Sequence, residues 1–260
     1  GENRVYYASI EQGRSSASRG GIGAVMGDKG VKAIVVRGTK DINLAQPAEY
    51  IGLCNEVLEY IKIREGNPIP GVMPILAGLG SPQEMKVHDE KWHTENFMWG
   101  NSRVRRKDFW NEEVEKEWTE TMEKARTRLV SCFNCPMECG ATISMPGLPT
   151  YMMKCFTKLT YTMGAFSDLD FGLSIAQKAT EYGVDGFSAP QVMAFALELL
   201  ENDILTDKDF PGMPEDSEGR FYYLLDKIVR REGVGDVLAN GTYWAAKEIG
   251  NGADAYAHNN

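Results

Sequence analysis

A glycine-rich run stands near the start of the 260-residue chain: Ser18-Arg19-Gly20-Gly21-Ile22-Gly23-Ala24-Val25-Met26-Gly27. It separates two segments of strand length that are rich in β-branched and aromatic residues, residues 4–10 and 31–37. These segments are the only clear β signal in the sequence, so the run is predicted to form a turn between two strands. Beyond residue 40 the pattern changes.

The glycine spacing limits what this turn can bind. Gly21, Gly23 and Gly27 give G-x-G-x-x-x-G, which is not the dinucleotide fingerprint, and the turn is too short for a crossover helix between parallel strands. Its backbone amides can still approach an anion beside the guanidinium of Arg19. A plain connection between two strands remains an equal alternative.

Helical spacing begins at Pro47, where apolar residues recur three and four positions apart as far as residue 61. Cys54 lies on this apolar stripe and is predicted to be a buried thiol. The irregular stretch 66–111 is expected to be functional or mobile. Further helices are predicted over residues 112–128, 169–182, 189–201, 220–231 and 234–249. The fold class is therefore mainly α with a short β segment at the N-terminus.

Composition excludes several classes of protein. Lys and Arg total 28 against 37 Asp and Glu, a net charge of −9, so the chain offers no basic field for nucleic acid or an anionic membrane surface. No apolar run approaches membrane-spanning length and no signal peptide is evident, so a cytoplasmic location is predicted. The absence of an initial methionine suggests a piece of a larger polypeptide.

Three of the five cysteines, Cys132, Cys135 and Cys139, fall within eight positions. Thiolates at this spacing suit an iron-sulfur cluster or zinc, each of which normally needs a fourth ligand. Candidates for that ligand are Cys155 and the histidines, none of which gives zinc-ribbon spacing. The pattern favours a 4Fe-4S cluster, with structural zinc and unligated thiols as alternatives.

Three segments together resemble the aldehyde ferredoxin oxidoreductase family. The first is residues 17–38, with Arg19-Gly20-Gly21 near its start and a Lys-Ala-Ile run towards its end. The second is Cys132-x-x-Cys135-Pro-x-x-Cys139-Gly, and the third is Glu181-Tyr182-Gly183-Val184-Asp185 followed by Ser188. The match extends over at least residues 1–200.

The resemblance implies a tungsten or molybdenum bis-pyranopterin beside a 4Fe-4S cluster. It places Arg19, Gly20 and Gly21 near the pterin and its phosphate, and Asp185 at a pterin edge. Residues 1–40 would be the last strands of the pterin-binding β domain, and residues 41–260 the helical middle domain of a three-domain fold. The cluster would be held by Cys132, Cys135 and Cys139, with the fourth cysteine in the family's last domain.

Two departures from the family pattern are informative. Thr180 stands where an aspartate is expected, which weakens one pterin contact. The stretch 151–157 lacks the glutamate of the aldehyde-oxidising members and contains Cys155 instead. This is similar to the class II benzoyl-coenzyme A reductase branch, in which a cysteine ligates tungsten.

That likeness implies reduction of the aromatic ring of benzoyl-coenzyme A, with Cys155 on tungsten. Imidazole suits proton delivery near neutral pH, so His93 is the expected donor, with Glu84 or His88 orienting or supplying it. Expected partners are benzoyl-coenzyme A or a related acyl-coenzyme A and a ferredoxin-like electron-transfer subunit within a larger oxidoreductase complex. The basic run Arg103–Lys107 could contact such partners, or be a solvated face.

Two other functions remain open. An aldehyde-oxidising relative with ferredoxin as acceptor would use the same cofactors, although it should keep the missing glutamate. A non-catalytic module would hold structural zinc on Cys132, Cys135 and Cys139. Metal content separates the enzymes from the module.

Overall fold

The computed structural model describes most of the N-terminal 61 residues, most of the residues from 169 to 257, and parts of the region between them. The described residues are 1–13, 15–18, 20–61, 112–131, 140–147, 149–154, 169–186 and 188–257. They fall into two compact units, the first comprising the described parts of 1–32, 112–121 and 169–257, and the second those of 33–61 and 122–154. The elements are mainly helical with short strands at the N-terminus, which confirms the predicted fold class. Within the described ranges, no helix is long and apolar enough to cross a bilayer.

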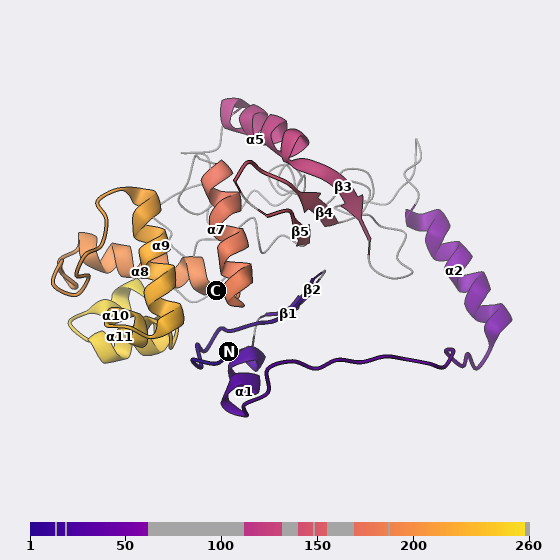
Figure 1. Ribbon diagram of the computed structural model, residues 1–260, viewed down its shortest axis with the longest axis horizontal. Helices are drawn as coiled ribbons and strands as arrows, with labels where there is room; N and C mark the ends of the chain where they lie inside the picture. Colours follow the sequence, from indigo (N-terminus) through magenta and orange to yellow (C-terminus); the bar gives the residue numbers. More distant parts are fainter. Residues whose placement is uncertain are drawn as a thin grey trace. The chain divides into compact units, whose positions relative to one another are not determined.

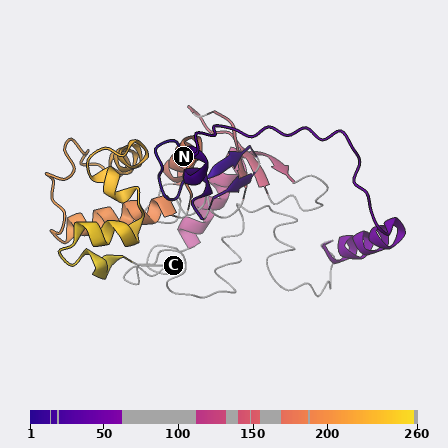
Figure 2. The same ribbon diagram turned by 90° about the horizontal axis from the view of Figure 1, so that it is seen from below.

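Five helices and a 3-10 helix form the larger part of the first unit. They are α7 (Leu169–Tyr182), α8 (Ser188–Glu201), α9 (Ser217–Arg230), α10 (Val234–Leu238), α11 (Thr242–Ile249) and η4 (Ala253–Tyr256). In Figures 1 and 2 they are the orange to yellow ribbons, and α8, α10 and α11 lie side by side in both views. Their packed faces make one apolar core. Its fully buried side chains include Ile175, Met193, Leu199, Leu224 and Leu225.

Helix boundaries follow local capping chemistry more closely than apolar spacing. The Asp216 side chain accepts a 2.6 Å hydrogen bond from the Gly219 N–H, so α9 begins at Ser217, three residues before the predicted start. The predicted helix 234–249 is two helices, because Gly241 has a φ of 84° between α10 and α11. A residue with a Cβ rarely adopts that conformation.

The N-terminal segment also differs from its prediction. Residues 4–10 do not form a strand of that length: strand β1 is Ile10–Gln12 and pairs antiparallel with β2 (Ser15–Ala17). Helix α1 (Ile22–Asp28) follows, with Gly21 as its N-cap, so the turn predicted for the glycine-rich run 18–27 is wrong for residues 22–27, which are helical. Tyr6–Ser9 instead lies against other parts of the first unit, and a single bridge joins Ala8 to Val184. Ala8 is completely buried.

In the second unit the helix predicted from Pro47 is confirmed as α2 (Pro47–Ile61). The strand predicted over residues 31–37 is not formed, since this stretch pairs with no described segment and Val35 is 92% exposed. The burial predicted for Cys54 is also wrong, because this thiol is only partly buried and Leu53 and Val57 beside it are exposed. Apolar spacing alone therefore did not determine whether these residues are buried.

A three-stranded antiparallel sheet in the second unit was not predicted. Helix α5 (Glu112–Ala125) ends three residues before the predicted end, and the chain continues directly as β3 (Arg126–Val130). Strand β4 (Gly140–Ile143) is central and pairs with both β3 and β5 (Tyr151–Lys154). Ala141 and Ile143 of β4 are completely buried.

The close packing of α9 and α10 generates a first prediction. A Cβ at Gly235 would lie 2.7 Å from the Ile228 nitrogen and closer still to the Lys227 carbonyl, so Gly235→Ala must push two backbones apart. We expect a loss of roughly 1–3 kcal/mol in the free energy of unfolding, measured by chemical denaturation of the full-length protein. Gly13→Ala is the control, because a Cβ there meets nothing within 4 Å. Equal transition midpoints for the two variants would contradict this packing.

Candidate cofactor site

Three of the predicted site residues are described: Gly20, Gly21 and Asp185. The others lie outside the described residues, so the structure does not place them: Arg19, Glu84, His88, His93, Cys132, Cys135, Cys139 and Cys155. The basic run 103–107 lies outside them as well. Within the described ranges, no three His, Cys, Asp or Glu side chains gather to hold a metal ion.

Asp185 is a completely buried carboxylate between α7 and α8. Its N–H donates to the Tyr7 carbonyl over 2.8 Å. Its Oδ2 accepts two hydrogen bonds from Ser188, one from the backbone N–H at 2.8 Å and one from the hydroxyl at 2.6 Å. This is the bonding of a helix N-cap, so one carboxylate oxygen is explained by the start of α8.

The second carboxylate oxygen of Asp185 has no such explanation. Oδ1 is buried and accepts no hydrogen bond from any described residue. Leaving a buried acceptor without a donor costs roughly 1–3 kcal/mol, and more when the group is charged. An acceptor kept at this cost suits a ligand that presents an N–H or O–H group.

Gly20–Gly23, which lead into helix α1 and which we call the glycine turn, contact the same N-terminal segment as Asp185. Gly21 has a φ of 69°, and a Cβ there would collide with the Tyr6 carbonyl oxygen. The Gly23 N–H donates to the Ala8 carbonyl over 3.1 Å, and a Cβ at Gly23 would lie 2.6 Å from that carbonyl. Gly21 and Gly23 are therefore required by backbone packing. Gly20 is exposed, with open space where a Cβ would stand.

Tyr6–Ser9 joins the two parts of the site. The Ser9 N–H donates to the Gly183 carbonyl over 2.9 Å, in addition to the Tyr7–Asp185 and Ala8–Gly23 bonds. The Tyr7 phenol is buried and donates to the Leu238 carbonyl at 3.2 Å, and this burial raises the pKa of Tyr7. Tyr7 was not predicted as a site residue, because its contribution is a backbone carbonyl in a segment that resembles an ordinary strand.

Thr180 does not replace the aspartate that is expected at its position. Its hydroxyl donates to the Ala176 carbonyl in the preceding turn of α7 at 2.9 Å. A hydroxyl that bonds to its own helix provides no charge to a ligand. The departure noted in the sequence therefore leaves Asp185 as the buried carboxylate of this segment, since Glu181 is exposed and pairs with Lys178.

The sheet of the second unit brings together the chain positions that flank the predicted metal ligands. Val130 pairs with Gly140, and Gly140 pairs with Lys154. Val130 lies two residues before Cys132, Gly140 directly follows Cys139, and Lys154 directly precedes Cys155. Because neighbouring strands lie about 4.8 Å apart, these three flanking positions share one end of the sheet within roughly 10 Å.

Two protein-family models match this chain and identify the family to which it belongs. The model of the aldehyde ferredoxin oxidoreductase N-terminal domain matches residues 1–38, and the model of domains 2 and 3 of that family matches residues 56–259. The chain therefore belongs to the aldehyde ferredoxin oxidoreductase family, a family of oxidoreductases, as the sequence resemblance implied. The domain boundary predicted at residue 40 stays a prediction.

Three individual proteins similar to this chain differ in how closely they match it. A chain of the active site complex BamBC of benzoyl coenzyme A reductase, solved with 1,5-dienoyl-CoA, is 81% identical with a TM-score of 0.88, over 100% of this chain and 40% of that one. A tungsten-containing aldehyde ferredoxin oxidoreductase of Pyrococcus horikoshii is 31% identical over 96% of this chain and 40% of its own length. The aliphatic sulfonate oxidoreductase WOR-like subunit of Pyrococcus furiosus is 26% identical over 96% and 39%. The chain thus spans about two fifths of the length of these relatives.

The two oxygens of Asp185 have separable roles, which generates a second prediction. Asp185→Ala removes the cap of α8 and should lower the free energy of unfolding by roughly 1–2 kcal/mol. Asp185→Asn keeps an oxygen for Ser188 and should remain near the wild-type value, because asparagine caps helices about as well. Thermal unfolding of the full-length protein measures both. Equal destabilisation by Asn and Ala would show that the cap does not depend on the retained oxygen.

Proposed function

We propose that the full-length protein reduces the aromatic ring of benzoyl-coenzyme A, or a closely related aromatic acyl-coenzyme A, to a cyclohexadienoyl-coenzyme A. The observation that carries the proposal is the 81% identity over the whole chain to the active site complex of benzoyl coenzyme A reductase. In this reaction two electrons and two protons enter the ring, and one of its double bonds is lost.

A tungsten bis-pyranopterin fits the described residues. A pterin presents N–H groups at its edge, and the buried Oδ1 of Asp185 is an acceptor without a donor among the described residues. The exposed glycine turn at Gly20 leaves backbone open beside Arg19, which would pair with the phosphate. When bound, this cofactor supplies electrons of very low potential at a tungsten centre.

The cysteines would hold the metals. Cys132, Cys135 and Cys139 would ligate a 4Fe-4S cluster that relays electrons, and Cys155 would ligate tungsten. The register that places Val130, Gly140 and Lys154 together supports this assignment, since the chain enters and leaves the predicted cluster segment, and enters the predicted tungsten segment, at one end of a sheet. Thiolate ligation adds electron density at the metal, which favours reduction of an aromatic ring.

Proton delivery falls to the histidine segment. His93 would donate a proton to the ring, because imidazole titrates near neutral pH, and Glu84 or His88 would orient or supply it. The thioester substrate would enter with its coenzyme A phosphates near the basic run 103–107. Electrons would come from a ferredoxin-like subunit of a larger complex.

Aldehyde oxidation is the second candidate. It is supported by the relatives named tungsten-containing aldehyde ferredoxin oxidoreductase, of which those from Pyrococcus horikoshii and Pyrococcus abyssi are each 31% identical. The residues 151–157 favour the ring reductase, because they contain Cys155 and no carboxylate.

Metal analysis and paired assays on the anoxically purified full-length protein test the proposal. We expect tungsten together with about four irons per subunit, the complement of one 4Fe-4S cluster. We also expect oxidation of a cyclohexadienoyl-coenzyme A by an artificial acceptor, and no oxidation of simple aldehydes. Turnover of aldehydes alone would replace the proposal with the second candidate, and zinc without tungsten would exclude both enzymes.

Asp185→Asn tests the cofactor contact separately from the fold. The substitution keeps the α8 cap but turns one side-chain oxygen into an NH2 donor, which would oppose an N–H of the cofactor. Since the loss of a partner around a metal site typically costs 10- to 100-fold in affinity, we expect tungsten per subunit to fall by roughly tenfold or more. Inductively coupled plasma mass spectrometry measures it. A variant with wild-type stability and full tungsten content would remove Asp185 from the cofactor site.

A further inference from the structure

Arg231 adopts a backbone conformation that is unfavourable for its residue type. It follows the last residue of α9 with a φ of 55° and a ψ of 48°, in the left-handed region where helices usually end on glycine. Its backbone N–H bonds to the Ile228 and Lys227 carbonyls, as a glycine would. The side chain, which glycine lacks, is therefore the feature to explain.

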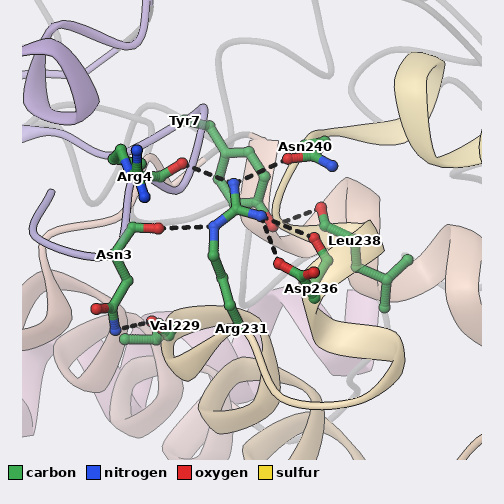
Figure 3. Close-up of polar contacts among 8 residues, drawn as sticks. All are labelled: Asn3, Arg4, Tyr7, Val229, Arg231, Asp236, Leu238 and Asn240. Atoms are coloured by element: carbon green, nitrogen blue, oxygen red, sulfur yellow. Dashed lines mark hydrogen bonds and ion pairs between the residues drawn. The ribbon is translucent and has the colours of Figure 1, made fainter. Parts of the chain in front are cut away.

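The guanidinium group of Arg231 uses its full set of donors. It has five N–H groups, and five hydrogen bonds leave it, as Figure 3 shows. Nε donates to the Asn3 carbonyl at 2.6 Å, and Nη2 to the Arg4 carbonyl at 2.7 Å and the Asn240 side chain at 2.8 Å. Nη1 donates to the Asp236 carboxylate at 2.7 Å and to its carbonyl at 3.0 Å.

These acceptors belong to two regions that are more than 220 residues apart in the chain. Asn3 and Arg4 are in the N-terminal segment, while Asp236 and Asn240 follow α9. Further bonds in the same place join the two regions: Asn3 Nδ2 to the Val229 carbonyl at 2.8 Å and Tyr7 to the Leu238 carbonyl at 3.2 Å. Arg231 is at the centre of a polar clamp, which we define as Asn3, Arg4, Arg231, Asp236 and Asn240.

The clamp lies directly before the segment that forms the cofactor site. Within six residues of Asn3, the carbonyls of Tyr7 and Ala8 accept from Asp185 and Gly23, and the Ser9 N–H donates to Gly183. The Tyr6 N–H also donates to the Ala239 carbonyl at 2.9 Å, beside Asn240 of the clamp. The position of Asp185 relative to the glycine turn therefore depends on where this segment is held.

We propose that Arg231 is a positioning residue for the cofactor site. By holding the carbonyls of Asn3 and Arg4 against the residues that follow α9, it fixes Tyr6–Ser9, and through that segment it fixes the distance between Asp185 and the glycine turn. The proposal rests on the proposed function in one respect, that Asp185 and the turn hold a pterin cofactor. It concerns loading of the cofactor and is independent of the substrate.

The positive charge of Arg231 does not explain why an arginine stands at this position. Its ion pair with Asp236 is largely solvated on the acid's side, which is 61% exposed, and such pairs contribute little. Lysine carries the same charge, but its ammonium is a single point with three donors. It cannot serve acceptors on both sides of the clamp in the way that a planar fork does.

The test compares Arg231→Gln and Arg231→Lys with Arg230→Gln in the anoxic full-length protein. Arg230 is the matched control, because it is adjacent in the chain, loses the same charge, and pairs with Asp226 on its own helix rather than with the N-terminal segment. Amide hydrogen exchange, followed by mass spectrometry of peptides that contain Gly23 and Asp185, reports on the clamp. Tungsten per subunit reports on the cofactor site.

We expect Arg231→Gln to speed exchange in both peptides and to lower tungsten content by roughly tenfold, the scale of effects from residues around a metal site. Arg231→Lys should be intermediate, and Arg230→Gln should match wild type in both measurements. Should Arg231→Gln not accumulate, Arg231→Gly removes the same guanidinium while favouring the left-handed conformation. The same loss is then expected.

Three results would overturn the proposal. Faster exchange with unchanged tungsten would make the clamp a support of the fold alone, and unchanged exchange would remove the link between the clamp and the site. Wild-type behaviour of Arg231→Lys would show that charge suffices. A tungsten-loaded wild-type protein that does not act on coenzyme A thioesters would overturn the proposed function instead, and would leave this result standing.

Discussion

The first unit depends on the need of a buried peptide backbone for hydrogen-bond partners. Of the stretch Tyr6–Ser9, the last three residues are buried without belonging to a helix or a regular sheet, so the backbone N–H and C=O groups of this stretch must find partners elsewhere. They find them at Gly23, Gly183, Asp185 and Ala239, which come from three distant parts of the chain. A short piece of irregular backbone thereby fixes the glycine turn, the start of α8 and the end of α10 relative to one another.

Apolar spacing predicted those helices that bury one face in this core. Helix α7 was predicted with its observed bounds, and α8 to within one residue, because Ile175, Met193 and Leu199 fall on faces that the core covers. Helix boundaries that depend on a single side chain or on the φ of a single residue could not be predicted from apolar spacing. The start of α9 depends on Asp216, and the division between α10 and α11 on Gly241. Apolar periodicity contains neither piece of information.

The strands were predicted poorly, because a strand is stabilised by a partner that can be far away in sequence. The run at 31–37 has ideal strand composition but pairs with no described segment. The sheet β3–β5 forms from Arg126–Val130 and two four-residue strands, which carry little β signal of their own. For the candidate site, the sequence resemblance suggested Asp185 and the glycine turn, whose contact with a cofactor stays a prediction. It gave no sign of Tyr7 or Arg231, since their contributions are long-range bonds to backbone groups.

The two oxygens of Asp185 distinguish a structural role from a binding role within one residue. If the start of α8 were the only requirement, asparagine or serine would cap it as well, without the cost of burying a carboxylate. The glycines that contact the same backbone segment show the reverse case, because the packing of Gly21 and Gly23 against Tyr6 and Ala8 explains them without any ligand. What the fold does not explain is Oδ1, a buried acceptor that meets no donor among the described residues. This unsatisfied hydrogen-bond acceptor, rather than the presence of a family motif, is the physical reason to propose that a cofactor with an N–H or O–H group binds beside Asp185.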